Sequence, residues 1–184
     1  MLNFGKTLVV AAHPDDEVLG CGGLIAKLIN QGEQVRVVFI AEGSSCRYEA
    51  LNKQAQEEIN FRNQCSIEAL RSLGVSSHNF YNLPCGRLDK GFFIEIAKII
   101  EKEISDYKPT TVLTHSSNDV HNDHKIVCRA VVQATRPVGK IVKNLLSFEI
   151  LSSTEWNYKE TFNPNIFVDV SSTINAKINA MNCY

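Results

Sequence analysis

The chain has 184 residues, of which 44% are hydrophobic and 21% are charged, so it can bury a core large enough for one domain without covalent staples. Nineteen basic side chains stand against 20 acidic ones, and the formal net charge is -1. This balance excludes the strongly basic surface that is typical of proteins that bind nucleic acids or anionic membranes.

The cysteines and the apolar runs indicate where the protein works. The six cysteines are scattered, without the spacing of a metal or redox motif, so we interpret them as reduced packing thiols. The start of the chain and its later stretches have no apolar run as long as a signal or membrane-spanning segment. We therefore expect a cytoplasmic protein with no stable membrane insertion. Its expected partner is a small molecule, and the sequence leaves homo-oligomerisation open.

Apolar runs rich in β-branched residues predict strands, and apolar residues at helical spacing predict helices. In chain order, the predicted elements are a strand at 7–12, a helix at 24–31, a strand at 34–43, a helix at 51–73, a strand at 78–83, a helix at 92–107, a strand at 110–115, a helix at 121–135, strands at 144–150 and 166–170, and a helical stretch at 174–184. Strands that alternate with helices of this length form parallel pairs, because parallel neighbours need a long crossover. The sequence predicts a Rossmann-like, three-layer α/β domain with a mostly parallel sheet.

The stretch "AAHPDDEVLGCGG" crowds a histidine and three acids at the carboxyl end of the first strand, where open α/β sheets bind ligands. A dinucleotide loop is disfavoured, because Ile25 stands where the third glycine of GxGxxG is needed and the acids would repel a pyrophosphate. His13 and Asp16 are three residues apart on a tight turn, close enough to bind one metal ion. The glycines that follow let the chain pass close by.

A second cluster, "THSSNDVHNDH", follows the strand at 110–115, so it lies at the same edge of the sheet. His121 and His124 are neighbours on one face of the helix that begins here. One of them can bind the metal while the other faces the substrate. With His124 as the ligand, the set of two imidazoles and the carboxylate of Asp16 has the composition of a catalytic zinc site that keeps a fourth position for water.

Three stretches resemble the LmbE-like, or PIG-L, family of zinc-dependent de-N-acetylases. These are "AHPDDEVLGCGG", "HNDH" and the tail "STEWNYKETFNPNIFVDVS". The resemblance covers nearly the whole chain, and the first two motifs together are highly specific. It implies that His13, Asp16 and His124 hold Zn²⁺ at the carboxyl ends of the strands.

The resemblance also implies catalytic roles. Asp15 would be the general base, and His121 would stabilise the tetrahedral oxyanion or assist the leaving amine. Asp123 would orient a histidine of the site, and Arg62, in "FRNQC", would contact the substrate. The expected function is removal of the N-acetyl group from an N-acetylglucosamine-type glycoconjugate by zinc-activated water.

Three departures from the family bear on the substrate and on the extent of the domain. Gln64 and Cys65 follow the arginine where the family often has acids, and Cys85 stands where an aspartate is common. Relatives usually continue past the position of Tyr184. We therefore expect a single LmbE-like deacetylase domain over residues 1–184, and whether a C-terminal segment is lacking stays open.

Two alternatives to the deacetylase remain at this stage. One is a metal-dependent hydrolase of another acyl amide or of a phosphoester, and a phosphoesterase would be expected to hold a second metal ion. The other is a non-catalytic module of the same fold that binds a small molecule. The sequence identifies neither the aglycone nor the pathway, and it does not separate zinc from iron.

Overall fold

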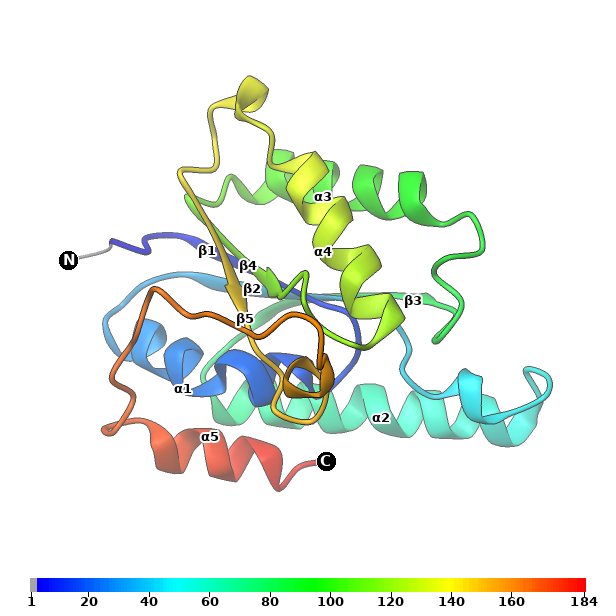
Figure 1. Ribbon diagram of the computed structural model, residues 1–184. Helices are drawn as coiled ribbons and strands as arrows, with labels where there is room; N and C mark the ends of the chain where they lie inside the picture. Colours follow the sequence, from blue (N-terminus) through cyan, green and yellow to red (C-terminus); the bar gives the residue numbers. More distant parts are fainter. Residues whose placement is uncertain (1–2) are drawn as a thin grey trace.

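Five parallel strands form the central sheet of the computed structural model, which describes residues 3–184 (Figure 1). The strands are β1 (Thr7–Ala11), β2 (Val35–Ala41), β3 (Ser77–Leu83), β4 (Thr111–His115) and β5 (Asn144–Phe148). Their order across the sheet is β3-β2-β1-β4-β5, and Val9 of β1 is in register with Val37 of β2 and Leu113 of β4. The predicted α/β class with a parallel sheet is confirmed.

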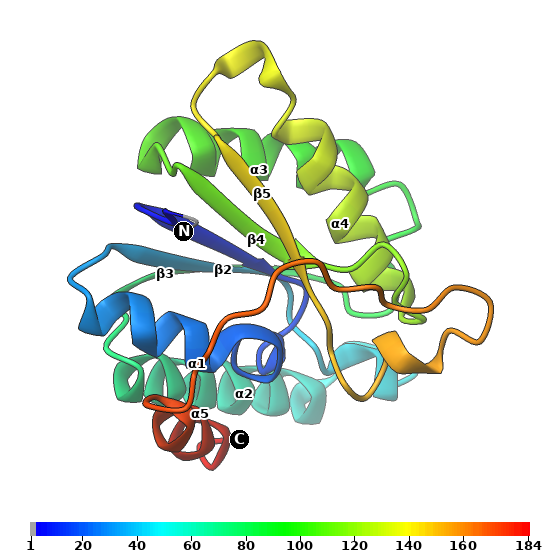
Figure 2. The same cartoon turned by 60° about the vertical axis from the view of Figure 1, so that its left-hand side comes forward.

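Helices cover both faces of the sheet. Helices α1 (Asp16–Asn30), α2 (Lys53–Ser72) and α5 (Ile174–Met181) lie on one face, and α3 (Phe93–Tyr107) and α4 (Asn122–Ala134) lie on the other (Figures 1 and 2). Every residue of β1 and β4 is buried, whereas the edge strands β3 and β5 are largely half-buried or exposed. Within residues 3–184, no helix is both long enough and apolar enough to cross a membrane.

Alternation along the central strands supplies two hydrophobic cores. In β1, Val9 and Ala11 pack with the side of α1 and α2, while Leu8 and Val10 pack with α3 and α4. All four side chains are fully buried. Complete burial of a valine or leucine stabilises the fold by about 1.5–3 kcal/mol, so β1 is anchored from both faces. The rigid position of its carboxyl end follows from this anchoring.

Helix α1 begins eight residues before the predicted start at Leu24, so that start was wrong. The prediction failed because Gly20, Gly22 and Gly23 have low helix propensity. Close packing overrides this propensity. A Cβ atom at Gly20 would overlap the ring of Phe148 at the end of β5, so glycine lets α1 approach the sheet. This approach brings the first turn of α1 against the ends of the strands.

The strand predicted at 166–170 is not formed, and that prediction was wrong. The β-branched residues of this run lie in an irregular strap that follows β5 and leads to α5 (Figure 2). The Lys27 Nζ donates a hydrogen bond of 2.7 Å to the Asp169 carbonyl, so the strap is tied to α1 and does not extend the sheet. The strap and β5 line a cavity of about 370 Å³.

Candidate metal centre and active site

The loops after all five strands meet at one edge of the sheet, where the polar side chains gather. In strand order from β1 to β5, these loops contribute His13, Glu42, Cys85, Asp119 and Ser153. All five of these side chains are buried. Buried polar side chains that come from the loops after every strand and gather at one edge of the sheet are typical of a functional site.

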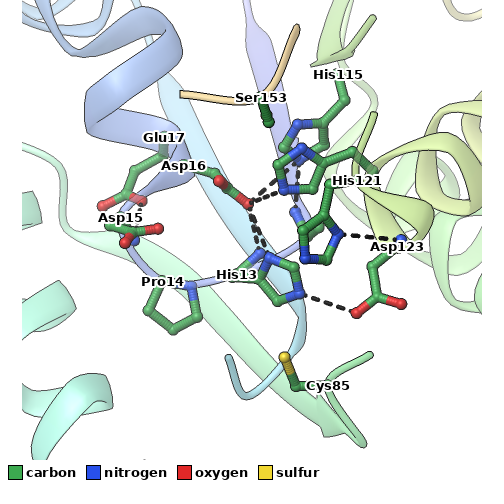
Figure 3. Close-up of polar contacts among 12 residues, drawn as sticks. His13, Pro14, Asp15, Asp16, Glu17, Cys85, His115, His121, Asp123 and Ser153 are labelled. Atoms are coloured by element: carbon green, nitrogen blue, oxygen red, sulfur yellow. Dashed lines mark hydrogen bonds and ion pairs between the residues drawn. The ribbon is translucent and has the colours of Figure 1, made fainter. Parts of the chain in front are cut away.

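Asp16 lies at the centre of the cluster. Its Oδ2 atom is 3.4 Å from Nδ1 of His13, 3.3 Å from Nε2 of His124 and 3.5 Å from Nε2 of His115. The same oxygen accepts a hydrogen bond of 2.8 Å from the His13 backbone N–H. Figure 3 shows His13, His115 and His121 gathered on one side of the Asp16 carboxylate. The structure therefore brings His13, Asp16 and His124 together.

Two aspartates orient the imidazole rings beside Asp16. The Asp123 Oδ2 atom lies 3.0 Å from Nε2 of His13, and the Asp119 Oδ2 atom lies 2.9 Å from Nδ1 of His124. A carboxylate accepts a hydrogen bond from the N–H of the ring nitrogen that it faces, so in the neutral ring the other nitrogen keeps its lone pair. In both histidines, this other nitrogen is the atom that faces Asp16.

The three converging atoms fit a cation. Two lone pairs and a carboxylate oxygen repel one another unless a proton or a metal ion lies among them. Ligands at about 2.0–2.1 Å from a tetrahedral ion are about 3.3–3.4 Å apart, and His13 and His124 lie at this distance from Asp16. Burial disfavours the charged form of His124, but Asp16 and Asp119 raise its pKa to about 9. Without a metal ion, a proton therefore compensates the cluster.

Three other triads of donor atoms lie close enough together in the described residues to be considered as metal ligands, and two of them already share atoms with hydrogen bonds. His115 could join Asp16 and His124, but its Nε2 accepts a hydrogen bond of 2.8 Å from the Ala12 N–H. Cys85 could join His13 and Asp123, but Asp123 Oδ2 also accepts the Gly86 N–H at 2.6 Å. The third triad, His13 with His121 and His124, contains no carboxylate and would form a site of three imidazoles.

His115 is a packing residue with one polar contact. It is fully buried, and its ring stacks on His124 with the ring centroids 4.0 Å apart. Burial lowers the pKa of His115 to about 3, so the ring is neutral. His115 therefore packs against the ring of His124, and its Nε2 is already bonded to the N–H of Ala12, the residue after β1.

His121 presents the opposite protonation pattern from His13. It precedes α4, and its Nδ1 accepts a hydrogen bond of 3.2 Å from the Asp123 backbone N–H. The proton of the neutral ring therefore lies on Nε2, which leaves a hydrogen-bond donor directed away from the helix. Burial, followed by the charges of His124 and His13, lowers the pKa of His121 and favours the neutral ring.

Asp15 points away from the histidines, beside Glu17 in Figure 3. Its carboxylate accepts a hydrogen bond of 2.6 Å from Arg62, which also donates two to the Pro14 carbonyl at 3.1 and 2.9 Å. Burial, followed by the charge of Asp16, raises the pKa of Asp15 to about 6, even though Arg62 opposes the rise. Such a pKa suits a group that accepts a proton near neutral pH.

A cavity of about 330 Å³ opens beside Asp15. Its lining residues are Asp15, Arg47, Glu58, Phe61, Arg62, Cys65 and Tyr184. Gly43 lets Arg62 reach the cavity, because a Cβ atom at this residue, whose φ is +79°, would lie 3.1 Å from Arg62 Nε and 3.3 Å from His13 Cβ. Arg62, predicted to contact substrate, lies at the cavity wall and is also bound to the loop that carries Asp15.

Sequence reasoning did not find the role of Asp119. Its carboxylate accepts hydrogen bonds from the hydroxyls of Ser153 at 2.8 Å and Thr154 at 3.0 Å, in addition to that from His124. The signal that could have found it is an aspartate in the same loop as the two histidines. Its partners lie 34 and 35 residues further along the chain, which the sequence pattern does not reveal.

Comparisons with known proteins identify the family of this chain. The family model of PIG-L, described as GlcNAc-PI de-N-acetylase, matches residues 8–135. The chain is 30% identical to the uncharacterized deacetylase YaiS of Escherichia coli K12, over 73% of this chain and 70% of the relative. It is 26% identical to the 1D-myo-inositol 2-acetamido-2-deoxy-alpha-D-glucopyranoside deacetylase of Mycobacterium sp. strain KMS, over 97% and 73% of the two chains.

A solved structure shares the architecture. The crystal structure of GalB, the 4-carboxy-2-hydroxymuconate hydratase of Pseudomonas putida KT2440, superposes with a TM-score of 0.75 at 26% identity. The alignment covers 97% of this chain and 78% of the hydratase. The family model spans more than half of the described chain and includes both histidine clusters. The chain therefore belongs to the PIG-L family of de-N-acetylases, which its sequence motifs predicted.

Proposed function

We propose that this protein is a metal-dependent amidohydrolase that removes the N-acetyl group from an N-acetylglucosamine-type glycoconjugate. The observation that carries the proposal is the convergence of two oriented imidazole lone pairs on Asp16, with Asp15 adjacent in sequence but bound to other partners. The family match and the deacetylase relatives support the choice of an N-acetylated sugar.

Zinc is the metal that this ligand set favours. His13, Asp16 and His124 would hold the ion, because two neutral imidazoles and one carboxylate are the ligands of many catalytic zinc sites. A zinc ion bound there would lower the pKa of a water molecule from about 15.7 to about 7 and polarise the acetyl carbonyl. Side chains of this protein carry out the other two tasks, which are proton transfer and stabilisation of the oxyanion.

Amide hydrolysis adds water to the acetyl carbon and breaks the C–N bond. Asp15 accepts the proton of the attacking water, because it is adjacent to Asp16 in sequence and is not itself one of the proposed metal ligands. The Nε2–H of His121 donates a hydrogen bond to the oxyanion that develops on the carbonyl. The proton held on Asp15 then passes to the amine nitrogen as the C–N bond breaks, so acetate and a free amine are released.

The cavity beside Asp15 accepts the portion of the substrate that is covalently bonded to the N-acetylated sugar. Its wall carries the guanidinium of Arg62 and the exposed ring of Phe61, which can donate hydrogen bonds and pack against a sugar ring. Arg62 thus contacts the substrate while it holds Asp15. The scattered cysteines, which lack the spacing of a disulfide framework, support a cytoplasmic location for the enzyme.

A panel of N-acetylglucosamine conjugates with sugar, inositol, malate and aromatic aglycones tests the proposal through acetate release. We expect turnover of at least one conjugate by the wild type and no turnover by Asp15→Asn with its metal content unchanged. The structural similarity to a hydratase supplies the rival reaction, so hydration of a conjugated dicarboxylic acid is measured in parallel. Hydration without acetate release from any conjugate would overturn the proposal.

A further inference from the structure

The backbone of Asp15 has an unusual conformation. Its φ is 105° and its ψ is -31°, in a region that residues with a side chain rarely adopt. A strained conformation of this kind persists only where surrounding contacts enforce it. The Asp15 carbonyl accepts the first hydrogen bonds of α1, from Val18 at 3.0 Å and Leu19 at 2.9 Å. The Asp15 N–H needs a separate partner.

Glu17 supplies this partner. Its Oε2 accepts the Asp15 N–H at 3.0 Å, and its Oε1 accepts the hydroxyl of Tyr184 at 2.6 Å. The Tyr184 oxygen lies 2.6 Å from the hydroxyl of Ser66 on α2, which donates to it. Glu17 is fully buried although it is not among the proposed metal ligands. A continuous chain of hydrogen bonds therefore runs from α2 through Tyr184 and Glu17 to the backbone of Asp15.

Helix α5 holds Tyr184 in this position. The Lys177 Nζ donates a hydrogen bond of 2.7 Å to the Leu19 carbonyl, and the Thr173 hydroxyl donates one of 2.8 Å to the Gly23 carbonyl. These carbonyls flank Cys21, where α1 is kinked with φ at -139°. The segment from Thr173 to Tyr184 thus braces the first turn of α1, which carries Asp15 and Asp16.

We propose that Glu17 and Tyr184 are positioning residues of the reaction: they fix the backbone of Asp15 so that its carboxylate faces the cavity as the general base. The inference rests on the proposed function and extends it to the C-terminal helix. A buried carboxyl group is costly where a leucine of similar volume would pack, so the fully buried one of Glu17 needs partners for both of its oxygens. Oε2 of Glu17 accepts the Asp15 N–H, and Oε1 accepts the hydroxyl of Tyr184.

Kinetics of four variants test the proposal on a conjugate that the wild type hydrolyses. Glu17→Leu removes the acceptor of the Asp15 N–H, and we expect kcat to fall about 100-fold with little change in KM or metal content. Glu17→Gln keeps an acceptor for this N–H and a polar partner for Tyr184, so its kcat should lie within about threefold of the wild type. Tyr184→Phe should lower kcat about tenfold.

Tyr81→Phe is the matched control. Tyr81 also donates a hydrogen bond, of 2.5 Å, to a buried carboxylate, that of Glu103, but this pair joins β3 to α3 away from Asp15. Its kcat should stay at the wild-type value. Equal kcat for Tyr184→Phe and Tyr81→Phe, an unchanged kcat for Glu17→Leu, or loss of metal from Glu17→Leu would each overturn the proposal.

Hydrogen exchange of the Asp15 amide gives a readout that does not depend on activity. In the metal-free protein, NMR should show this amide exchanging at least about tenfold faster in Glu17→Leu than in the wild type, and at the wild-type rate in Tyr81→Phe. Equal exchange in Glu17→Leu and the wild type would contradict the inference. A wild type that releases no acetate would refute the proposed function instead, and the exchange rates would still decide this inference.

Discussion

His13, His121 and His124 lie side by side, but their hydrogen bonds give the three rings different protonation patterns. Asp123 and Asp119 take the proton-bearing nitrogens of His13 and His124, which leaves each a lone pair toward the metal position. His121 accepts a backbone N–H, which leaves it a proton to donate. At the scale of single residues, the hydrogen-bond partner of each imidazole therefore decides whether the ring offers a lone pair to the metal or a proton to the substrate.

Replacement of His121 tests the assigned donor. In His121→Ala, the hydrogen bond to the developing oxyanion is lost, so kcat should fall about 10²- to 10³-fold while metal content stays at the wild-type value. Steady-state acetate release and metal analysis measure the two quantities. His78→Ala, on β3, is the control. Full activity of His121→Ala would contradict the assignment.

Replacement of Asp119 tests the orientation of His124. Asp119→Asn keeps the shape of the side chain but removes the charge that faces Nδ1 of the ring, so metal affinity should fall about 10- to 100-fold. Competition with a chromophoric chelator measures this affinity. Asp106→Asn, at an exposed ion pair with Lys102, should leave it unchanged. Equal affinities in the two variants would show that Asp119 does not act on the metal.

At the scale of elements, Glu42 joins the loops that follow β2 and β3. Its carboxylate accepts the N–H groups of Ser44 at 2.6 Å, Ser45 at 2.9 Å and Cys85 at 2.8 Å. The turn after Cys85 presents the Gly86 N–H to Asp123, so Glu42 indirectly supports the acid that orients His13. Burial raises the pKa of Glu42, but these backbone hydrogen bonds outweigh it and lower the pKa overall.

The lowered pKa predicts how stability depends on pH. An acid whose pKa is lower in the folded state stabilises the protein above its unfolded pKa, about 4.3 for glutamate, and this stabilisation is lost as the pH falls through the folded value. Glu42→Gln places an amide N–H against backbone donors, so it should cost about 1.5–3 kcal/mol at pH 7.

Urea unfolding from pH 7 down to pH 3 measures this dependence. The difference in the free energy of unfolding between the wild type and Glu42→Gln should be constant above pH 5 and shrink below about pH 4. Glu160→Gln, at an exposed site, is the control. A difference that stays constant down to pH 3 would contradict the prediction.

The elements themselves were largely predictable. The strands of the sheet appear in the sequence as apolar runs because helices cover both faces of the sheet. Helix α3 ends at Tyr107, as predicted from the proline at position 109. The predicted elements were wrong where the local conformational preference of the residues disagrees with the tertiary packing. The glycines after the HPDDE stretch lie inside α1 because Phe148 requires close approach. The β-branched run at 166–170 does not pair with the edge strand β5 and forms an irregular strap, which Asp169 ties to Lys27 of α1.

At the scale of the whole molecule, the sheet serves as a rigid platform and its carboxyl edge as the site. Apart from Arg62 on α2, the predicted site residues came from motifs at that edge, which the sheet topology brings together. The contacts that tune them could not be predicted, since Glu17 and Tyr184 are 167 residues apart and Asp15 and Arg62 are 47 apart. Pairing over such separations depends on how α1, α2 and α5 pack, which no local pattern records.

Because the hydrophobic core lies apart from the site, we expect core mutations to lower the free energy of unfolding without changing the metal affinity. Ile100 of α3 is fully buried, so Ile100→Ala should lower the free energy of unfolding by about 2–5 kcal/mol while metal affinity stays unchanged at temperatures where the protein is folded. Ile94→Ala, on the same helix but 55% exposed, should cost less than about 0.5 kcal/mol. A similar cost at both positions, measured by urea unfolding, would contradict this packing.

The proposed reaction requires a metal ion that His13, Asp16 and His124 hold. The most direct test is the metal content of the purified protein, measured with acetate release from an N-acetylglucosamine conjugate before chelation, after chelation and after zinc is restored. We expect about one zinc per chain, loss of activity when the metal is removed, and recovery of activity when zinc is restored. Acetate release that persists in metal-free protein, or failure to bind zinc at all, would contradict it.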